Sequence, residues 1–158
     1  MIMRFTVRPD QGEANGFDLG DILVSGPLGE ASSVGHVPDQ GMMLYLSVPE
    51  LLESLTGLLT RRSSSASFSG IDSSFGLGFR MKRKTITVAG RSGPVAQVSR
   101  AELAEAVLSA AEELAGLHIA PTPARALTAA QDPARGHYLD VLQRFRLVAA
   151  QVTGSSAA

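Results

Sequence analysis

The first part of the chain alternates polar and apolar positions over short stretches, a pattern typical of strands. Residues 4–8 alternate and stop at Pro9, and residues 19–25 contain an apolar triplet, so both are predicted to be strands. Residues 26–41 are rich in Gly, Pro and Ser, which predicts a long loop of a kind that is often functional. Residues 42–46 are expected to form a strand or an extended lead-in to the first helix.

Two later segments place apolar residues on one face of a helix and begin with the same capping signal. The first helix is expected over about residues 48–60, where Ser47-Val48-Pro49-Glu50 matches a capping box ahead of a leucine stripe. The second is expected over about residues 100–116, behind the similar box Ser99-Arg100-Ala101-Glu102. In each box the serine side chain accepts from the backbone three residues on, while the glutamate reaches back.

A third, longer helix is expected over about residues 133–151, after a proline-containing connector at residues 120–126. Asp132 precedes Pro133, which places a capping side chain before a proline at the first helical position. The apolar stripe of this helix is wide enough to serve either the core or a contact between two copies of the chain. Its members are Tyr138, Val141, Leu142, Phe145 and Val148.

Strand patterns return between the first two helices. Residues 75–89 are expected to form an antiparallel hairpin, because large apolar residues alternate with Gly and Arg before a β-branched stretch. The tip is Lys82-Arg83-Lys84, and the alternation assigns Phe75 and Phe79 to the core face. Residues 63–74 are expected to be either a flexible serine-rich link or to contain a strand at 67–69, and residues 95–98 a short strand.

Together these elements predict an α+β fold. We expect an antiparallel sheet of about five to six strands, with the two capped helices on one face and a longer C-terminal helix alongside. A chain of 158 residues is the size of one domain, which we place at residues 1–151. Residues 152–158 are expected to form a flexible tail, because the chain has only small residues from Gly154 onward and nothing there to bury.

Composition narrows the class of protein. The chain is 44% hydrophobic and 18% charged with a mean hydropathy of +0.13, which is too apolar for a disordered protein. It contains no run of about 20 apolar residues and no basic leader followed by an apolar core, so we expect a soluble, cytoplasmic protein. It also contains no cysteine, which excludes disulfides, thiolate metal sites and cysteine nucleophiles.

The net charge of −1 hides a strong asymmetry along the chain. Residues 1–60 carry two basic and eight acidic side chains, a net charge of −6. Residues 61–91 carry seven basic side chains against Asp72, a net charge of +6, and residues 92–158 carry −1. Either the two charged segments neutralise each other within the fold, or one of them faces an acidic partner or a nucleic acid.

The sequence contains no catalytic or metal-binding motif, so we assign no catalytic residue, no cofactor and no metal. His36, His118 and His137 lack the spacing of a zinc helix, and we interpret them as structural or solvated. No phosphate-binding loop, dinucleotide fingerprint or nucleophile elbow is present. The one charged feature that supports a hypothesis is the basic hairpin of Arg80 with Lys82-Arg83-Lys84.

Within residues 41–103, the order of the helix and strand motifs is similar to that of a known class of proteins. A capped leucine helix (Leu46-Ser47-Val48-Pro49-Glu50-Leu51-Leu52) is followed by Phe68, by Phe75-Gly76-Leu77-Gly78-Phe79 and by Thr85-Ile86-Thr87-Val88. This order resembles the small immunity-type proteins of bacterial polymorphic toxin systems. The resemblance implies a protein that is not an enzyme and that binds a partner protein through a charged surface.

We therefore expect a non-catalytic protein-binding module that acts through charged surface contacts, and the resemblance implies an immunity-like role. A second hypothesis is a small-molecule-binding protein or enzyme with a cleft near residues 26–41 and His36, which a pocket joining His36 to a carboxylate would favour. A third is nucleic-acid binding through the basic hairpin, with Phe75 and Phe79 as stacking platforms. The partner is expected to be another protein, with a homodimer through residues 133–151 as a further option, and no membrane. The candidate interaction residues are Asp18, Asp21, Glu30, Asp39, Arg80, Lys82, Arg83 and Lys84.

Overall fold

The computed structural model describes residues 1–156 and contains two antiparallel sheets. The first sheet has the order β1-β2-β3, and β4 pairs with the start of β2 beyond the end of β3. The second sheet is a meander of consecutive strands, β5-β6-β7-β8. The strands are β1 (Ile2–Val7), β2 (Leu19–Gly26), β3 (Gly29–Ser32), β4 (Met42–Met43), β5 (Ser65–Ser69), β6 (Gly76–Lys82), β7 (Thr85–Gly90) and β8 (Gly93–Val98).

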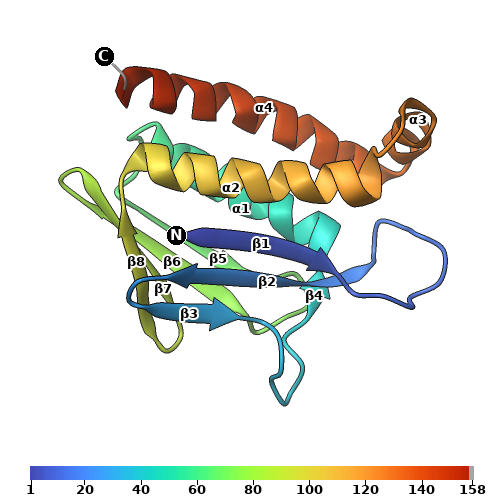
Figure 1. Cartoon of the computed structure of the whole chain (residues 1–158), viewed down its shortest axis with the longest axis horizontal. Coiled ribbons are helices and arrows are strands. Elements are labelled where there is room, and N and C mark those ends of the chain that lie inside the picture. Colours follow the sequence, from blue (N-terminus) through green and yellow to red (C-terminus); the bar gives the residue numbers. More distant parts are fainter. Residues whose placement is uncertain (157–158) are drawn as a thin grey trace.

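The helices lie together on one side of the sheets (Figure 1). α1 packs against β5, α2 packs against β1, and α4 lies across both α1 and α2. The short helix α3 sits at the end where the chain turns from α2 into α4 (Figure 1). The helices are α1 (Leu44–Leu59), α2 (Arg100–Leu114), a π-helical turn (Ala115–Ile119), α3 (Pro123–Gln131) and α4 (Pro133–Ser156).

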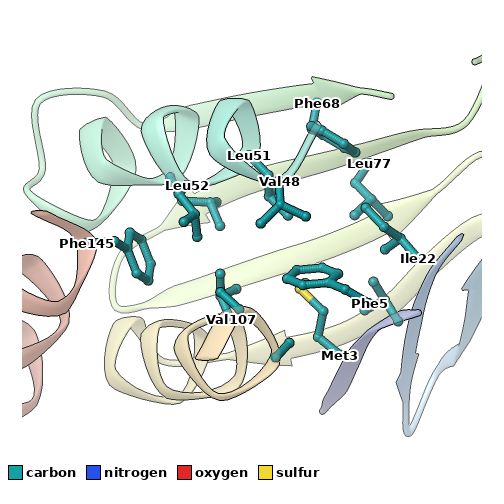
Figure 2. Packing of buried hydrophobic residues seen from close by; sticks show 14 of the residues in the cluster. Met3, Phe5, Ile22, Val48, Leu51, Leu52, Phe68, Leu77, Val107 and Phe145 are labelled. Carbon is teal, nitrogen blue, oxygen red and sulfur yellow. The ribbon is translucent and has the colours of Figure 1, made fainter. Parts of the chain in front are cut away.

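One continuous hydrophobic core lies between the helices and the two sheets. Figure 2 shows side chains from both sheets meeting side chains from α1, α2 and α4. The side chains labelled there are Met3, Phe5, Ile22, Val48, Leu51, Leu52, Phe68, Leu77, Val107 and Phe145. Phe75 and Phe79 are also buried, as the alternation of the hairpin predicted. Because both sheets contribute to one core, the chain folds as a single packed unit over the described residues.

The α+β class, the antiparallel pairing and the long last helix are confirmed, but the expectation of one sheet of five to six strands is wrong. Part of the error lies in residues 26–41, which were expected to be a loop and instead contain β3. The sequence Gly29-Glu30-Ala31-Ser32 has no β-branched residue and no alternation, so local pattern alone does not identify it as a strand. It is a strand because it pairs antiparallel with residues 23–26 of β2.

The two sheets meet where β3 lies beside β8, and the backbone N–H of Leu28 donates to the carbonyl of Val95 at 2.9 Å. Two glycines make this approach possible. A Cβ on Gly26 would lie 2.6 Å from the carbonyl oxygen of Val95, and a Cβ on Gly90 would lie 2.6 Å from the Cβ of Ala31. Both distances are too short for any side chain, so these positions require glycine for close packing between the sheets.

The start of the first helix differs from the capping-box prediction. α1 begins at Leu44, and its N-cap residue Met43 makes no side-chain hydrogen bond. Ser47 lies inside the helix, where its hydroxyl donates to the carbonyl of Met43 at 2.8 Å and accepts from the N–H of Ile71 at 2.9 Å. The buried serine therefore ties the helix to the turn that follows β5 rather than capping the helix.

The starts of the other two predicted helices, α2 and α4, are confirmed. Ser99 accepts from the N–H of Glu102 at the start of α2, and Asp132 accepts from the N–H groups of Ala134 and Arg135 at the start of α4. The pKa of Asp132 is lowered, because these hydrogen bonds and the charge of Arg135 outweigh the opposing effect of burial.

The end of α1 at Leu59 agrees with the predicted end near residue 60, but the ends of the other two predicted helices and the connector were not predicted correctly. α2 does not stop at Gly116 but continues as a π-helical turn to Ile119, and the expected connector contains the start of α3. α4 runs to Ser156, so the flexible tail expected from residue 152 is helical over its described part. Residues 157–158 of that expected tail lie outside the described residues.

The apolar stripe of α4 is buried within one chain. Tyr138, Leu142 and Phe145 are each at most 1% exposed, and the Tyr138 hydroxyl donates to the carbonyl of Ala111 at 2.7 Å. The Tyr138 ring also meets the Tyr45 ring edge to face, with centroids 6.2 Å apart. The stripe that motivated a homodimer through residues 133–151 is therefore occupied by α1 and α2. None of the helices within residues 1–156 is long and apolar enough to span a membrane.

Candidate functional site

Four basic side chains surround a hollow of about 440 Å³ at one end of the molecule. Arg61 and Arg62 follow the end of α1, and Arg83 and Lys84 form the tip between β6 and β7. Figure 1 shows that tip and the end of α1 at the same end of the fold. Ser63, Ser64 and Met81 complete the lining, which contains no acidic residue. We call this site, defined by these seven residues, the basic hollow.

Local structure explains why the basic side chains gather there. Ser65 pairs with Arg80 in the β5–β6 ladder, and the N–H of Met81 donates to the carbonyl of Ser64 at 2.8 Å. This pairing brings the residues just before β5 beside the residues just after β6. The C-terminal end of a helix also carries a partial negative charge, which stabilises the nearby cations of Arg61 and Arg62.

A further arginine lies beneath the end of α1. The guanidinium of Arg100 donates to the carbonyl of Leu59 at 2.6 Å and so satisfies one of the last free carbonyls of the helix. The pKa of Arg100 is lowered by burial and by the positive charge of Arg61. The charge of one arginine thus acts on another, as expected where positive charge accumulates without neutralising partners.

The acidic segment of the chain does not neutralise the basic one by direct pairing. Within the part of the chain that the structure describes, none of the seven basic residues of 61–91 forms an ion pair. The ion pairs that do form involve other residues. They are Arg8–Asp21, Arg8–Asp39, Arg135–Asp132, Arg146–Glu112 and, if the histidine is protonated, His137–Glu53. The basic hollow therefore keeps its charge available for an external anion.

One arginine binds two of the acidic candidates, Asp21, which is mostly buried, and Asp39, which is exposed. The guanidinium of Arg8 donates to both carboxylate oxygens of Asp21, at 2.9 and 3.0 Å, and to both of Asp39, at 2.7 and 2.8 Å. The hydroxyl of Ser33, which is fully buried, donates to Asp21 at 2.7 Å. This arrangement, which we call the Arg8 clamp, fastens the segment around Asp39 to β1 and β2.

The Arg8 clamp changes the protonation behaviour of its members. Burial acts to raise the pKa of Asp21, but hydrogen bonds from Arg8 and Ser33 outweigh it, and the pKa is lowered. Hydrogen bonds from Arg8 and from the N–H of Gly41 hold the pKa of Asp39 well below its usual range. The pKa of Arg8 is raised by its hydrogen bonds to Asp39 and Asp21. All three groups are therefore charged at neutral pH, and the structure uses Asp21 and Asp39 for its own stability.

The remaining candidates fall into two groups. Asp18 is buried and accepts from the N–H of Asn15 at 3.2 Å, while Glu30 is exposed on β3. The acidic candidates therefore do not form one acidic surface. Arg80 and Lys82 are exposed on β6, and Arg83 and Lys84 line the basic hollow. Arg61 and Arg62 were missing from the candidate set, because only the pairing of β5 with β6 reveals that they belong to it.

A second, larger hollow of about 540 Å³ lies beside the segment of residues 34–40. His36, Glu30 and Arg91 are the charged or titratable groups in its lining. Nε2 of His36 lies 2.7 Å from the carbonyl oxygen of Ser32, so this nitrogen carries the proton and donates it. We call this site the His36 hollow. Among residues 1–156 no three His, Asp or Glu side chains are placed to hold a metal ion.

No protein-family model matches this chain, and neither a curated protein nor a solved structure matches it with significance.

Proposed function

We propose that this protein is a non-catalytic binding module that recognises an acidic surface of a partner protein through the basic hollow. The observation that carries the proposal is the gathering of Arg61, Arg62, Arg83 and Lys84 around one hollow with no acidic residue in its lining. Guanidinium groups bind carboxylates through paired, charge-assisted hydrogen bonds, so a cluster of Asp and Glu side chains is the ligand that such a site fits.

Two properties of the chain favour an acidic protein over a nucleic acid. The chain has a net charge of −1, whereas domains that bind nucleic acid are typically strongly basic. Phe75 and Phe79, the candidate stacking platforms, are 4% and 2% exposed and face the core. Stacking of bases on aromatic rings supplies much of the sequence-tolerant affinity for single strands, and neither ring is available for it.

The resemblance to immunity-type proteins suggests which kind of protein the partner is. In that case the partner is a toxin domain that presents carboxylates to the basic hollow. Complementary charge across such an interface accelerates association and makes it depend on salt.

Reversing two charges of the basic hollow is expected to weaken partner binding by about a hundredfold, or about tenfold for each close charge pair that is broken. The partner is first captured from native lysate on the tagged protein, eluted in steps of rising salt, and identified by mass spectrometry. Binding of the purified partner to the wild type and to an Arg83→Glu, Lys84→Glu variant is then measured by calorimetry at low salt. The association rate and its dependence on salt should fall in the same variant.

The matched control reverses two exposed arginines outside the basic hollow, Arg4 on β1 and Arg125 on α3. The Arg4→Glu, Arg125→Glu variant changes the net charge by the same amount and should keep nearly full affinity. An equal loss in both variants would contradict a local site. Binding of an oligonucleotide rather than a protein at low salt would support the nucleic-acid hypothesis instead.

A second candidate function rests on the His36 hollow, the larger of the two sites. Its lining contains His36, the carboxylate of Glu30 and the cation of Arg91, which are polar groups of the kind that orient a small ligand in a pocket. If a small molecule binds there, chemical-shift changes in a ligand screen should cluster on these residues. The His36→Gln variant should then weaken binding, whereas His118→Gln in the π-helical turn should not.

A further inference from the structure

We propose that the acidic partner reaches beyond the basic hollow and lays an extended segment, with carboxylates at alternate positions, along the outer side of β6. This inference rests on the proposed function, because it continues the same partner along the molecule. One side of β6 carries buried residues such as Leu77, and the other side faces away from the core. We call the four outward positions of the strand the β6 face. They are Gly76, Gly78, Arg80 and Lys82.

The β6 face is an open surface of the protein. The helices lie on the opposite side of the second sheet, where Phe68 and Leu77 join the core with side chains of α1 (Figure 2). Arg80 and Lys82 are exposed, and the two glycines are partly buried. An acidic segment can therefore reach this face without displacing any part of the described chain.

Charge indicates what this face binds. None of the strands β5 to β8 contains an Asp or Glu residue. Arg80 and Lys82 form no ion pair with any residue of 1–156. Lys82 is followed directly by Arg83 and Lys84, so the positive surface continues from the basic hollow onto β6. A chain that runs along this face is therefore favoured when it carries several negative charges.

A shallow hollow lies at the other end of the β6 face. It has a volume of about 300 Å³, its lining includes Gly76, Gly78 and Arg91, and that lining contains no acidic residue. Arg91 lies in the turn between β7 and β8. A segment that crosses the hollow therefore meets the cation of Arg91 at one end and the cations of Arg80 and Lys82 at the other.

The geometry of a strand indicates that the bound segment is extended. Successive outward side chains of one strand, such as Arg80 and Lys82, are about 7 Å apart. Alternate residues of an extended segment laid along β6 have the same separation, so successive carboxylates lie opposite successive cations. A helix repeats every 5.4 Å or so along its axis, and its carboxylates fall out of step with these cations.

Gly78 provides an argument that does not depend on charge. Glycine weakens the interior of a strand, so its presence there needs a reason. At Gly76 the reason is internal, because a Cβ would lie 3.1 Å from the carbonyl oxygen of Phe68. A Cβ on Gly78 would meet no atom within 4 Å, and its φ is not in the left-handed region. Gly78 therefore serves to leave room for another backbone to approach the sheet.

The test uses two synthetic peptides of equal charge and composition. In the alternating peptide, Glu and Thr follow each other in turn, so that carboxylates stand at every second position. In the block peptide all Glu residues precede all Thr residues, and the basic hollow alone can hold its charged half. Fluorescence anisotropy at low salt should show that the full-length chain binds the alternating peptide about tenfold more tightly.

Three variants and one control for each kind of change locate the contact. Gly78→Val should weaken the alternating peptide by about tenfold and leave the block peptide unchanged, because the new side chain holds an extended segment away from β6. Gly154→Val on α4, where a Cβ also meets no atom within 4 Å, should change neither affinity. Arg80→Glu should weaken the alternating peptide by about tenfold, whereas Arg4→Glu on β1 should not.

Stability separates an open glycine from a structural one. Gly78→Val should resist urea at least as well as the wild type, because valine favours strands and fills only open space there. A clear loss of stability would show that Gly78 serves the fold, and would overturn its role as a point of approach.

The remaining outcomes decide the occupant. Equal affinity of the wild type for the two peptides, or an alternating-peptide affinity that Gly78→Val leaves unchanged, would overturn the extended segment. A short oligothymidylate that binds more tightly than either peptide and is lost in Gly78→Val would assign the β6 face to a nucleic acid instead.

The same peptides keep this inference separate from the proposed function. The Arg83→Glu, Lys84→Glu variant should weaken both peptides, because both use the basic hollow. If it weakens both while Gly78→Val weakens neither, the inference fails and the proposed function stands. If it weakens neither, the proposed function fails.

Discussion

Replacing Phe145 by alanine is expected to destabilise the protein by about 3–5 kcal/mol, the usual cost of removing a large aromatic side chain from a core. Phe145 is 1% exposed and joins α4 to the core that α1 and α2 share with the sheets (Figure 2). The surrounding side chains come from separate elements that are fixed by their own hydrogen bonds, so they cannot fully close the cavity left behind. The loss is measured as a change in the denaturant midpoint at constant slope.

The same helix provides the control for this substitution. Leu147 lies two residues further along α4 and is 66% exposed. Leu147→Ala should therefore change the free energy of unfolding by less than about 0.5 kcal/mol. If Phe145→Ala changed the free energy of unfolding as little as Leu147→Ala, α4 would not be part of the cooperative core. The last helix would then unfold separately from the rest of the chain.

The elements that were predicted correctly are those whose signals are local. The strands near residues 4–8 and 19–25 and the hairpin at 75–89 show alternation within a few residues, and the structure has β1, β2, β6 and β7 there. Ser99 and Asp132 cap their helices through hydrogen bonds to residues two or three positions on. Such contacts form wherever the backbone begins a helix, so their sequence signature is dependable.

The elements that were missed depend on contacts between distant residues. β3 has no strand-forming side chains and exists because β2 and the second sheet lie beside it. Ser47 was interpreted as a cap because its partner, the N–H of Ile71, is 24 residues away. The contact between the two sheets likewise depends on the close approach of Gly26 to Val95, which no local pattern encodes.

In the candidate site, too, the residues found from the sequence are those with a local signal, and the ones missed depend on contacts between distant residues. Arg83 and Lys84 were identified because they are adjacent in a predicted turn, whereas Arg61 and Arg62 join them through the β5–β6 pairing. The acidic candidates failed to form a surface because Arg8, 13 residues from Asp21 and 31 from Asp39, recruits both. The sequence shows that acidic side chains gather in residues 1–60 and basic ones in residues 61–91. It does not show which of these side chains form ion pairs in the fold.

Replacing Arg8 by methionine is expected to destabilise the protein by about 3 kcal/mol, since it leaves a mostly buried carboxylate without its cation. The Asp21 side chain is 13% exposed and keeps only the hydroxyl of Ser33 as a polar side-chain partner in that variant. Methionine preserves the length of the aliphatic stem, so the effect isolates the guanidinium. The Arg8→Met, Asp21→Asn double variant should recover part of the loss, because its side chain at position 21 no longer carries a charge.

The Arg8 clamp also predicts how stability depends on pH. Asp21 and Asp39 both have a lowered pKa in the folded state, so they bind protons less readily there than in the unfolded chain. Their contribution is complete above the unfolded pKa of about 4 and is lost as the pH falls below it toward the folded pKa values. Urea denaturation between pH 7 and pH 2 should therefore show a decline in the free energy of unfolding below about pH 4 that is shallower in Arg8→Met.

Loss of the Arg8 guanidinium should also raise hydrogen exchange in residues 34–40, which line the His36 hollow, because Asp39 no longer anchors them. A wild-type slope retained in Arg8→Met would show that other carboxylates control acid stability, and that the Arg8 clamp does not fix this segment.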